Sequence, residues 1–240
     1  MDIVALSGGK DSTALALRLM EVEPKDYTFI CTPTGDELPE MEEHWRNLEY
    51  LLGKPLLKIR HKLNLNELID FYKALPSWRM RWCTRQLKIE VAQAFYLAHP
   101  GSTAYVGLRA DEEEREGGIY GEKVIKQRYP LREWGWGINE VTEYLKKRGV
   151  SIPRRTDCAR CCFQKLGEWW DLWKNYPEIY KNAEDQELKY GHTFRSPSRD
   201  TWPASLAGLR SEFESGRVPR GANINGDDTL NEQKCRTCSI

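Results

Sequence analysis

The chain begins with a short segment whose residue types suit the binding of phosphate groups, Ser7-Gly8-Gly9-Lys10-Asp11-Ser12. It follows an apolar run at residues 3–6 and precedes a helical pattern at residues 12–21. Two glycines let the backbone approach an anion closely, and a helix that starts here directs free N–H groups and its positive dipole end toward it. The lysine adds a positive charge, and the two serines add hydroxyl donors. We therefore expect residues 7–12 to hold the phosphates of a nucleotide, with catalytic roles for Lys10 and Asp11.

Strand and helix patterns alternate along the first 150 residues. Short apolar runs bounded by turn residues predict strands at residues 2–6, 27–32, 56–60, 103–108 and 123–129. Helical patterns lie between them, at residues 12–21, 40–52, 65–74 and 84–99. This alternation predicts an α/β fold whose mostly parallel, doubly wound sheet has helices on both faces. Ligands of such sheets bind outside the carboxyl ends of the strands, so that edge should collect residues 7–12, 34–37 and 107–109.

The composition changes after a helical pattern at residues 138–149. A cysteine cluster and a tryptophan-rich stretch follow, with further helical patterns at residues 178–190 and 204–214 and a segment rich in glycine and asparagine at 216–226. We therefore divide the chain into a nucleotide-binding α/β domain at residues 1–150 and a helical, cysteine-rich appendage with a flexible tail at residues 151–240. The helical spacing of Trp169, Trp170 and Trp173 predicts that they pack the appendage onto the sheet.

Charge and hydropathy limit the environment of the protein. The 36 basic and 36 acidic residues balance, so net charge argues neither for nor against a nucleic-acid partner. No apolar stretch approaches the ~20 residues that span a bilayer. A first strand at residue 2 leaves no room for a targeting peptide, so we expect a cytoplasmic protein without a membrane partner. Seven cysteines then indicate metal or redox chemistry rather than disulfides, although Cys31 lies in an apolar strand and should be a core residue.

Two pairs of cysteines have the spacing of chelating pairs, Cys158 with Cys161 and Cys235 with Cys238. Together they predict a tetrathiolate site for Zn²⁺ or for an iron–sulfur cluster. Arginines at positions 154, 155 and 160 should favour thiolates there. A competing quartet combines Cys83, Cys158 and Cys161 with Cys162 or a tail cysteine. We favour the two pairs, because Cys162 directly after Cys161 is awkwardly placed to reach the same ion. Two thiols besides Cys31 are left over in either case. A thiol left over is a candidate for the reactive one, and Cys83 is the catalytic candidate.

Six segments resemble those of the sulfonucleotide (PAPS/APS) reductases and ATP pyrophosphatases of the adenine-nucleotide alpha-hydrolase superfamily. Residues 7–12 resemble their PP-loop, the phosphate-binding loop of these proteins. Five further segments follow in family order, at residues 34–40, 81–88 around Cys83, 107–115, 130–145 and 158–161. The resemblance covers residues 1–180 and implies an adenine nucleotide as ligand.

Three residues at the strand ends are predicted to lie near that nucleotide. Gly35 and Gly107 permit close approach of a base or ribose. Arg109 has the bidentate geometry that holds phosphate or sulfate, with an ion pair to the acidic run 111–114 as the alternative.

The intact Lys10 and Asp11 resemble the loop of enzymes that bind ATP and release pyrophosphate. The family therefore implies ATP with Mg²⁺, adenylylation of an acceptor oxygen, and a role in sulfur transfer or reduction, with a 4Fe-4S cluster or, alternatively, Zn²⁺. One alternative function is a phosphoadenosine or adenosine phosphosulfate reductase with a nucleophilic cysteine in its C-terminal tail. Another is a non-catalytic nucleotide- and DNA-binding module with a structural metal. Expected partners are a nucleic-acid acceptor or a thiol or electron-donor protein, with a homodimer allowed.

Overall fold

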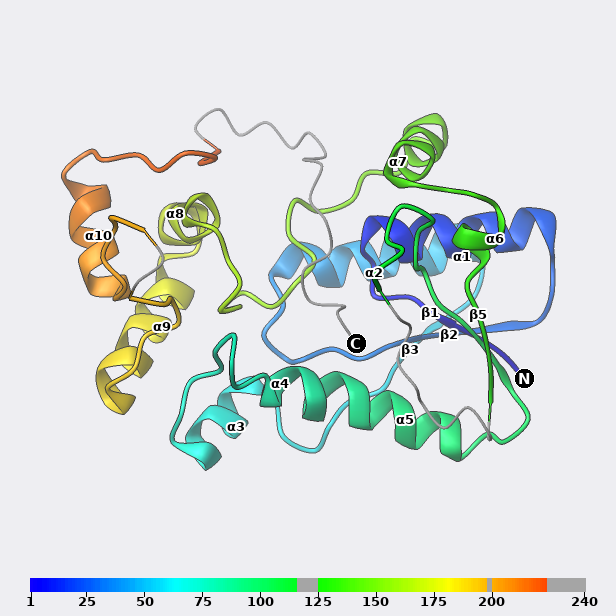
Figure 1. Ribbon diagram of the computed structural model, residues 1–240, viewed down its shortest axis with the longest axis horizontal. Helices are drawn as coiled ribbons and strands as arrows, with labels where there is room; N and C mark the ends of the chain where they lie inside the picture. The colour runs from blue at the N-terminus through cyan, green and yellow to red at the C-terminus, as the bar shows by residue number, and fades with distance from the viewer. Residues whose placement is uncertain (116–124, 198–199, 224–240) are drawn as a thin grey trace.

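The computed structural model describes residues 1–115, 125–197 and 200–223, and its centre is a five-stranded sheet (Figure 1). The strand order is β3-β2-β1-β4-β5, and every neighbouring pair is parallel. The strands are β1 (Asp2–Ala5), β2 (Tyr27–Cys31), β3 (Leu56–Lys58), β4 (Thr103–Tyr105) and β5 (Lys126–Arg128). The predicted α/β fold with a parallel sheet is confirmed. The apolar runs of β3 and β4 continue beyond the strands into loops at the carboxyl edge, so these strands are shorter than predicted.

Helices cover both faces of this sheet, because side chains alternate between the faces along each strand. Val4, Phe29 and Tyr105 pack on the face that carries α1 (Lys10–Val22), α2 (Pro39–Leu52), α6 (Pro130–Glu133) and α7 (Ile138–Lys147). Ile3, Ile30 and Ala104 pack against Tyr96 of α5 (Glu90–Leu97) on the other face. Figure 1 shows α1, α2, α6 and α7 above the sheet and α5 below it.

The helix predicted at residues 84–99 is interrupted near its start. It consists of the short α4 (Trp82–Thr84), a π-helical stretch at Arg85–Ile89 and then α5. A π-helical turn inserts an extra residue and is frequent at functional sites. Side chains of this interrupted region, Cys83, Thr84 and Lys88, line the pocket described below.

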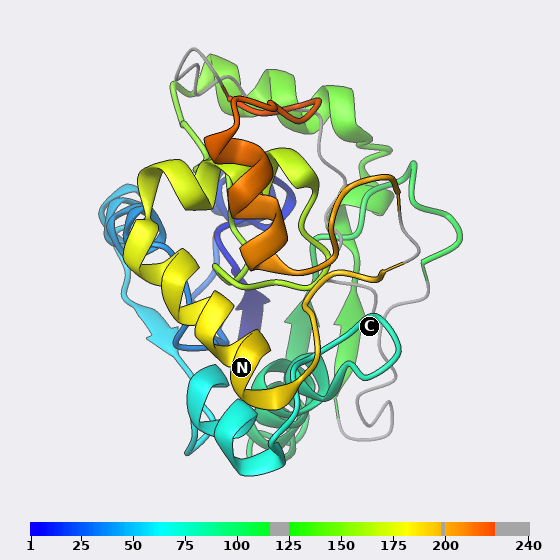
Figure 2. The same ribbon diagram turned by 90° about the vertical axis from the view of Figure 1, so that its left-hand side faces the viewer.

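The C-terminal helices gather at one end of the sheet, where they meet α3 (Leu65–Tyr72), as the turned view shows (Figure 2). They are α8 (Leu166–Asn175), α9 (Pro177–Tyr190) and α10 (Leu206–Glu214). Trp169 is fully buried, and its ring lies 6.4 Å from that of Tyr180 and 5.9 Å from that of Phe194.

One apolar cluster joins these helices to the first 150 residues. It contains Leu65, Leu68 and Leu87 from the N-terminal side together with Trp169 and Leu206 from the C-terminal side. The predicted tail cysteines, Cys235 and Cys238, lie outside the described residues. Among the helices that the structure describes, none combines the length and the apolar character needed to cross a membrane.

Candidate functional site

The loop at residues 7–12 joins β1 directly to α1 at the carboxyl edge of the sheet. Gly8 has φ 91°, a conformation that glycine adopts readily and other residues rarely adopt. A Cβ atom at this position would lie 2.8 Å from Nε1 of Trp45, so a side chain has no room. Ser12 Oγ donates to the Gly9 carbonyl at 3.0 Å and closes the first turn of α1. The loop therefore has the conformation expected of a phosphate-binding strand-to-helix turn.

Two buried side chains of α2 hold this loop in place. Trp45 Nε1 donates to the Ser7 carbonyl at 2.9 Å, and His44 Nε2 lies 2.9 Å from the Gly8 carbonyl. Burial lowers the pKa of His44, which favours the neutral ring with its proton on Nε2 toward that carbonyl. These contacts fix two loop carbonyls toward α2. Sequence reasoning missed both residues, since only their helical spacing indicates that they share the buried face of α2.

Arg109 is fully buried beside the start of α1. Its Nη1 donates to Asp11 Oδ2 at 2.8 Å and its Nε to Asp111 Oδ1 at 2.8 Å, while Nη2 lies 3.5 Å from Glu112 Oε1. The guanidinium therefore binds the carboxylates of three residues, including Asp11 of the loop itself. This arrangement favours positioning of Asp11 by Arg109, and direct contact between Arg109 and a nucleotide stays a prediction.

The two predicted glycines also lie at this edge, each in close contact with protein atoms. Gly35 follows β2 with φ 77°, and a Cβ atom there would lie 2.7 Å from Cβ of Asn64. Gly107 follows β4, where a Cβ atom would lie 3.1 Å from the backbone nitrogen of Ser12. The absence of a side chain at Gly107 therefore lets the end of β4 pack against the first turn of α1. Their contact with a base or ribose stays a prediction.

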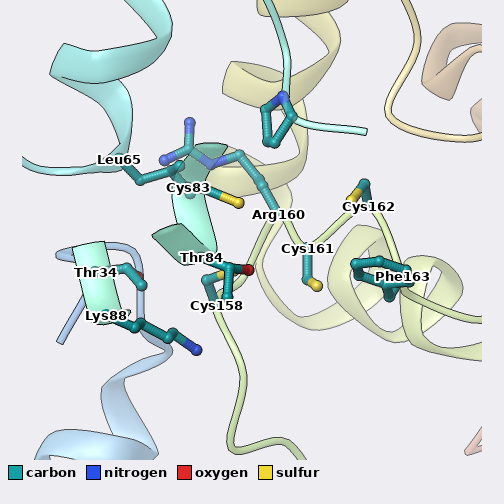
Figure 3. Close-up of a pocket in the computed structure, with 11 residues that line it drawn as sticks. Thr34, Leu65, Cys83, Thr84, Lys88, Cys158, Arg160, Cys161, Cys162 and Phe163 are labelled. Atoms are coloured by element: carbon teal, nitrogen blue, oxygen red, sulfur yellow. The ribbon is translucent and has the colours of Figure 1, made fainter. Parts of the chain in front are cut away.

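A pocket beside this edge is lined by four cysteines from two distant parts of the chain (Figure 3). Cys83 comes from α4, and Cys158, Cys161 and Cys162 come from the segment before α8. Thr34, which follows β2, lines the same pocket and so connects it with the carboxyl edge of the sheet. All four cysteines, and Cys31 in the core, are free thiols.

The thiols of the pocket interact with one another. Hydrogen bonds from Cys158 and Cys162 lower the pKa of Cys161 well below its usual value, and the same hydrogen bonds raise the pKa of the two donors. Burial raises the pKa of Cys83. One thiolate, at Cys161, is therefore favoured within the cluster. Across the described ranges of the chain, no three His, Cys, Asp or Glu side chains are already arranged to hold a metal ion.

Positive charge acts on these sulfurs from Lys88 and from Arg155. The charge of Lys88 lowers the pKa of Cys83, Cys158 and Cys161, although burial and hydrogen bonding outweigh it at the first two. The neighbouring arginines were expected in this role. Arg155 has it in part, because its charge interacts with the charges of Cys158 and Cys161, and the arginines also have other partners. The guanidinium of Arg155 donates to the Cys158 carbonyl at 2.8 Å and to Gln164 Oε1 at 2.9 Å. Arg154 pairs with Asp171 at 2.9 Å.

The cysteine segment is attached to the loop after β2 through its backbone. Ala159 N–H donates to the Asp36 carbonyl at 2.6 Å, and Glu37 and Cys158 form an antiparallel bridge. Glu37 in turn accepts from Thr34 N–H at 2.6 Å and Gly35 N–H at 3.0 Å. The cysteine pocket and the loops at the carboxyl edge of the sheet therefore form one continuous region.

The chain is similar in sequence or in fold to known proteins. The chain is 24% identical over 201 residues to an uncharacterized protein of Methanocaldococcus jannaschii; the match covers 78% of this chain and 42% of that protein, so the chain corresponds to less than half of its length. A crystal structure of phosphoadenylyl-sulfate (PAPS) reductase from Candida auris, in complex with phosphate, aligns with 63% of this chain and 74% of its own, at a TM-score of 0.48 and 18% identity.

The family comparison covers the α/β part of the chain and includes the loop at residues 7–12. Residues 2–154, more than half of the chain, match the model of the phosphoadenosine phosphosulfate reductase domain. The chain therefore belongs to the phosphoadenosine phosphosulfate reductase domain family.

Proposed function

We propose that this protein is an enzyme that binds ATP, with Mg²⁺, at the loop of residues 7–12 and transfers its adenylyl group. Family membership supports a sulfonucleotide reductase-type role in general terms. The observation that carries the more specific proposal is the loop itself. It combines Lys10 with a helix N-terminus, two carbonyls held toward α2 and an Asp11 fixed by Arg109.

The residues of this loop suit the departure of pyrophosphate. An acceptor oxygen would attack the α-phosphorus, its new P–O bond replacing the bond to the pyrophosphate oxygen, and the acceptor would lose its proton to solvent. Negative charge builds up on the leaving pyrophosphate. Lys10 and the free N–H groups at the start of α1 would stabilise that charge by position and electrostatics.

The cysteine pocket is the proposed site of a metal centre in the same enzyme. Cys83, Cys158, Cys161 and Cys162 supply four sulfur donors, the ligand type of iron–sulfur clusters and of structural Zn²⁺. These four residues thus supply the donors. Cys158 and Cys162 are hydrogen bonded to Cys161, so the thiols are not already arranged for a metal. A bound cluster would add redox and electrostatic chemistry next to the nucleotide edge.

Reduction of an adenylyl sulfate is the second candidate, and the family match favours it. In that reaction a cysteine thiolate would attack the sulfate sulfur and displace the nucleotide, and a thiol reductant would then release sulfite from the cysteine. Cys161, whose thiolate is favoured, and the tail cysteines are the available nucleophiles. Release of sulfite from an adenylyl sulfate with a thiol reductant would select this candidate, and release of pyrophosphate from ATP would select the first.

Nucleotide binding is tested with Lys10→Ala and with Lys181→Ala as the matched control, an exposed lysine on α9. Loss of one charge-assisted phosphate contact should cost about 1.5–3 kcal/mol of binding free energy, which is roughly ten- to a hundredfold in affinity. ATP with Mg²⁺ should also raise the melting temperature of the native protein more than GTP does. Unchanged ATP affinity of Lys10→Ala in calorimetry would contradict the assignment of the loop.

A further inference from the structure

Residues 71–88 form a segment with an unusual concentration of positive charge, called here the basic–aromatic segment. It contains no aspartate or glutamate and has five basic residues, Lys73, Arg79, Arg81, Arg85 and Lys88, in a chain whose formal net charge is zero. Lys73, Arg79 and Arg85 are exposed. Such a local cluster attracts polyanions even when the whole chain is neutral.

Large apolar side chains are exposed on the same segment. Phe71 is 69% exposed, Trp78 is 58% exposed and Met80 is 52% exposed. Trp78 lies in a tight turn between Ser77 and Met80. Ser77 N–H donates to the Met80 carbonyl at 3.2 Å, and Met80 N–H donates to Ser77 Oγ at 3.1 Å. Exposed aromatic rings between positive charges provide stacking surfaces for unpaired bases.

Arg81 adds an independent indication of an anionic ligand. Its Nε and Nη2 atoms are buried, yet they hydrogen bond to no atom within the part of the chain that the structure describes. The guanidinium lies 5.2 Å from the ring centre of Phe163, which satisfies none of these donors. Buried donors of a charged group are costly when left without acceptors, and a phosphate oxygen is the acceptor that a guanidinium binds best.

We propose that the basic–aromatic segment is a binding surface for single-stranded nucleic acid. Arginines 79, 81 and 85 bind the backbone phosphates, and Trp78 and Phe71 stack on bases. A duplex offers no free base faces for this stacking.

The same segment forms one wall of the cysteine pocket, through Pro76, Cys83, Thr84 and Lys88. A strand bound here lies beside the proposed reaction site. Binding of the strand does not depend on the proposed function. Only the reaction that the bound strand would enter rests on it.

The test is fluorescence anisotropy of the full chain with a fluorescein-labelled single-stranded oligonucleotide, as RNA and as DNA, over a series of salt concentrations. The variants are Arg79→Ala/Arg85→Ala and Trp78→Ala. The matched controls are Lys146→Ala/Lys147→Ala at exposed positions of α7, which removes the same charge, and Tyr50→Ala, which removes a ring that is 86% exposed on α2. Figure 1 shows α7 across the sheet from α3 and α4; the segment starts at the end of α3 and includes α4.

We expect the double arginine variant to lower the slope of log K against log salt by about 1.4 for two lost phosphate contacts. Trp78→Ala should weaken binding by roughly tenfold, as expected for one lost stacked base. Both controls should bind as the native protein does, and a duplex of the same sequence should bind more weakly than the single strand.

Three results would overturn the proposal: equal losses in the α7 control, unchanged binding by Trp78→Ala, or binding to heparin as tight as to the oligonucleotide. The last two would indicate a general polyanion surface. ATP-induced stabilisation is measured in the same variants, so that failure of the nucleic-acid surface and failure of the proposed nucleotide site are distinguished. Retained stabilisation with lost oligonucleotide binding would support the surface as a separate site.

Discussion

Arg160 and Asp36 form a buried ion pair that connects the cysteine segment with the loop after β2. Arg160 Nε donates to Asp36 Oδ1 at 3.0 Å, and the backbone N–H of Arg160 donates to Oδ2 at 3.1 Å. Only 3% of Arg160 and 7% of Asp36 are exposed. Because Arg160 lies between Cys158 and Cys161, this pair fixes the cysteine pocket relative to the loops at the carboxyl edge of the sheet.

The first prediction follows from that pair. Asp36→Asn should lower the free energy of unfolding by about 3–5 kcal/mol, because it leaves the buried guanidinium of Arg160 without its counter-charge. The pocket thiols should also react faster with a thiol reagent, since the segment that carries them loses its attachment. Urea unfolding and the rate of thiol modification measure the two effects.

Asp185→Asn is the control for this prediction. Asp185 pairs with Lys181 at 2.6 Å, and both side chains are more than half exposed. Such a pair should contribute about 0–1 kcal/mol. A loss of stability in Asp36→Asn no larger than in Asp185→Asn would contradict a structural role for the buried pair.

The second prediction concerns the support of the phosphate loop by α2. Trp45→Phe removes the indole N–H that donates to the Ser7 carbonyl and keeps most of the buried ring. One hydrogen bond of this kind contributes about 1 kcal/mol, so affinity for ATP with Mg²⁺ should fall about fivefold. Calorimetric titration measures it. The conservative change Trp134→Phe, at the C-cap of α6, should leave affinity unaltered. An equal loss of affinity there would indicate general destabilisation instead.

The third prediction uses a buried carboxyl group of α9. Glu187 accepts from Phe194 N–H at 2.9 Å and from Leu206 N–H at 2.6 Å, and burial raises its pKa to about 7. Its folded-state pKa lies above the unfolded value, so its contribution to stability is present below about pH 4.5 and is lost as pH rises through about 7.

Glu187→Gln removes this titration, although its amide nitrogen cannot replace the second acceptor oxygen. The variant should therefore be less stable at low pH and should lose less stability than the native protein between pH 4.5 and 7. Thermal unfolding at a series of pH values measures the difference, with Glu178→Gln, an exposed position on α9, as control. Parallel curves for native protein and Glu187→Gln would contradict the raised pKa.

The sheet, the helices and the phosphate loop could be predicted from local sequence patterns. Alternating apolar runs define β1 and β2, and the glycines, lysine and serines of residues 7–12 have local reasons to form a strand-to-helix turn. The contacts of Trp45 with Ser7 and of Arg160 with Asp36 could not be predicted in this way. They join segments that only the tertiary packing brings together, and a single sequence has no periodicity that marks such pairs.

The charged residues that act on the thiols could not be fully predicted from local sequence patterns either. Proximity along the chain favoured arginines 154, 155 and 160 as the cations near the thiols. Arg155 does act electrostatically on Cys158 and Cys161. The three guanidiniums also bind carboxylates, carbonyls and amide oxygens, because a buried guanidinium needs several acceptors at once. Lys88 lines the pocket from the π-helical turn, whose extra residue no spacing rule indicates.

The last prediction separates the two cysteine quartets. If the pocket holds the metal, Cys83→Ser and Cys162→Ser should each lose stoichiometric metal, as should serine at Cys158 or Cys161, because each removes one of four ligands. Cys31→Ser should keep the metal, since Cys31 lies in β2 within the core.

Truncation before Lys234 removes Cys235 and Cys238 and should leave the metal content unchanged. Metal analysis and absorption spectra of anaerobically purified protein measure each case and distinguish iron–sulfur from zinc. Metal lost on truncation and kept by Cys83→Ser and Cys162→Ser would instead assign the site to Cys158, Cys161 and the tail pair, as the spacing of the two pairs in the sequence favours.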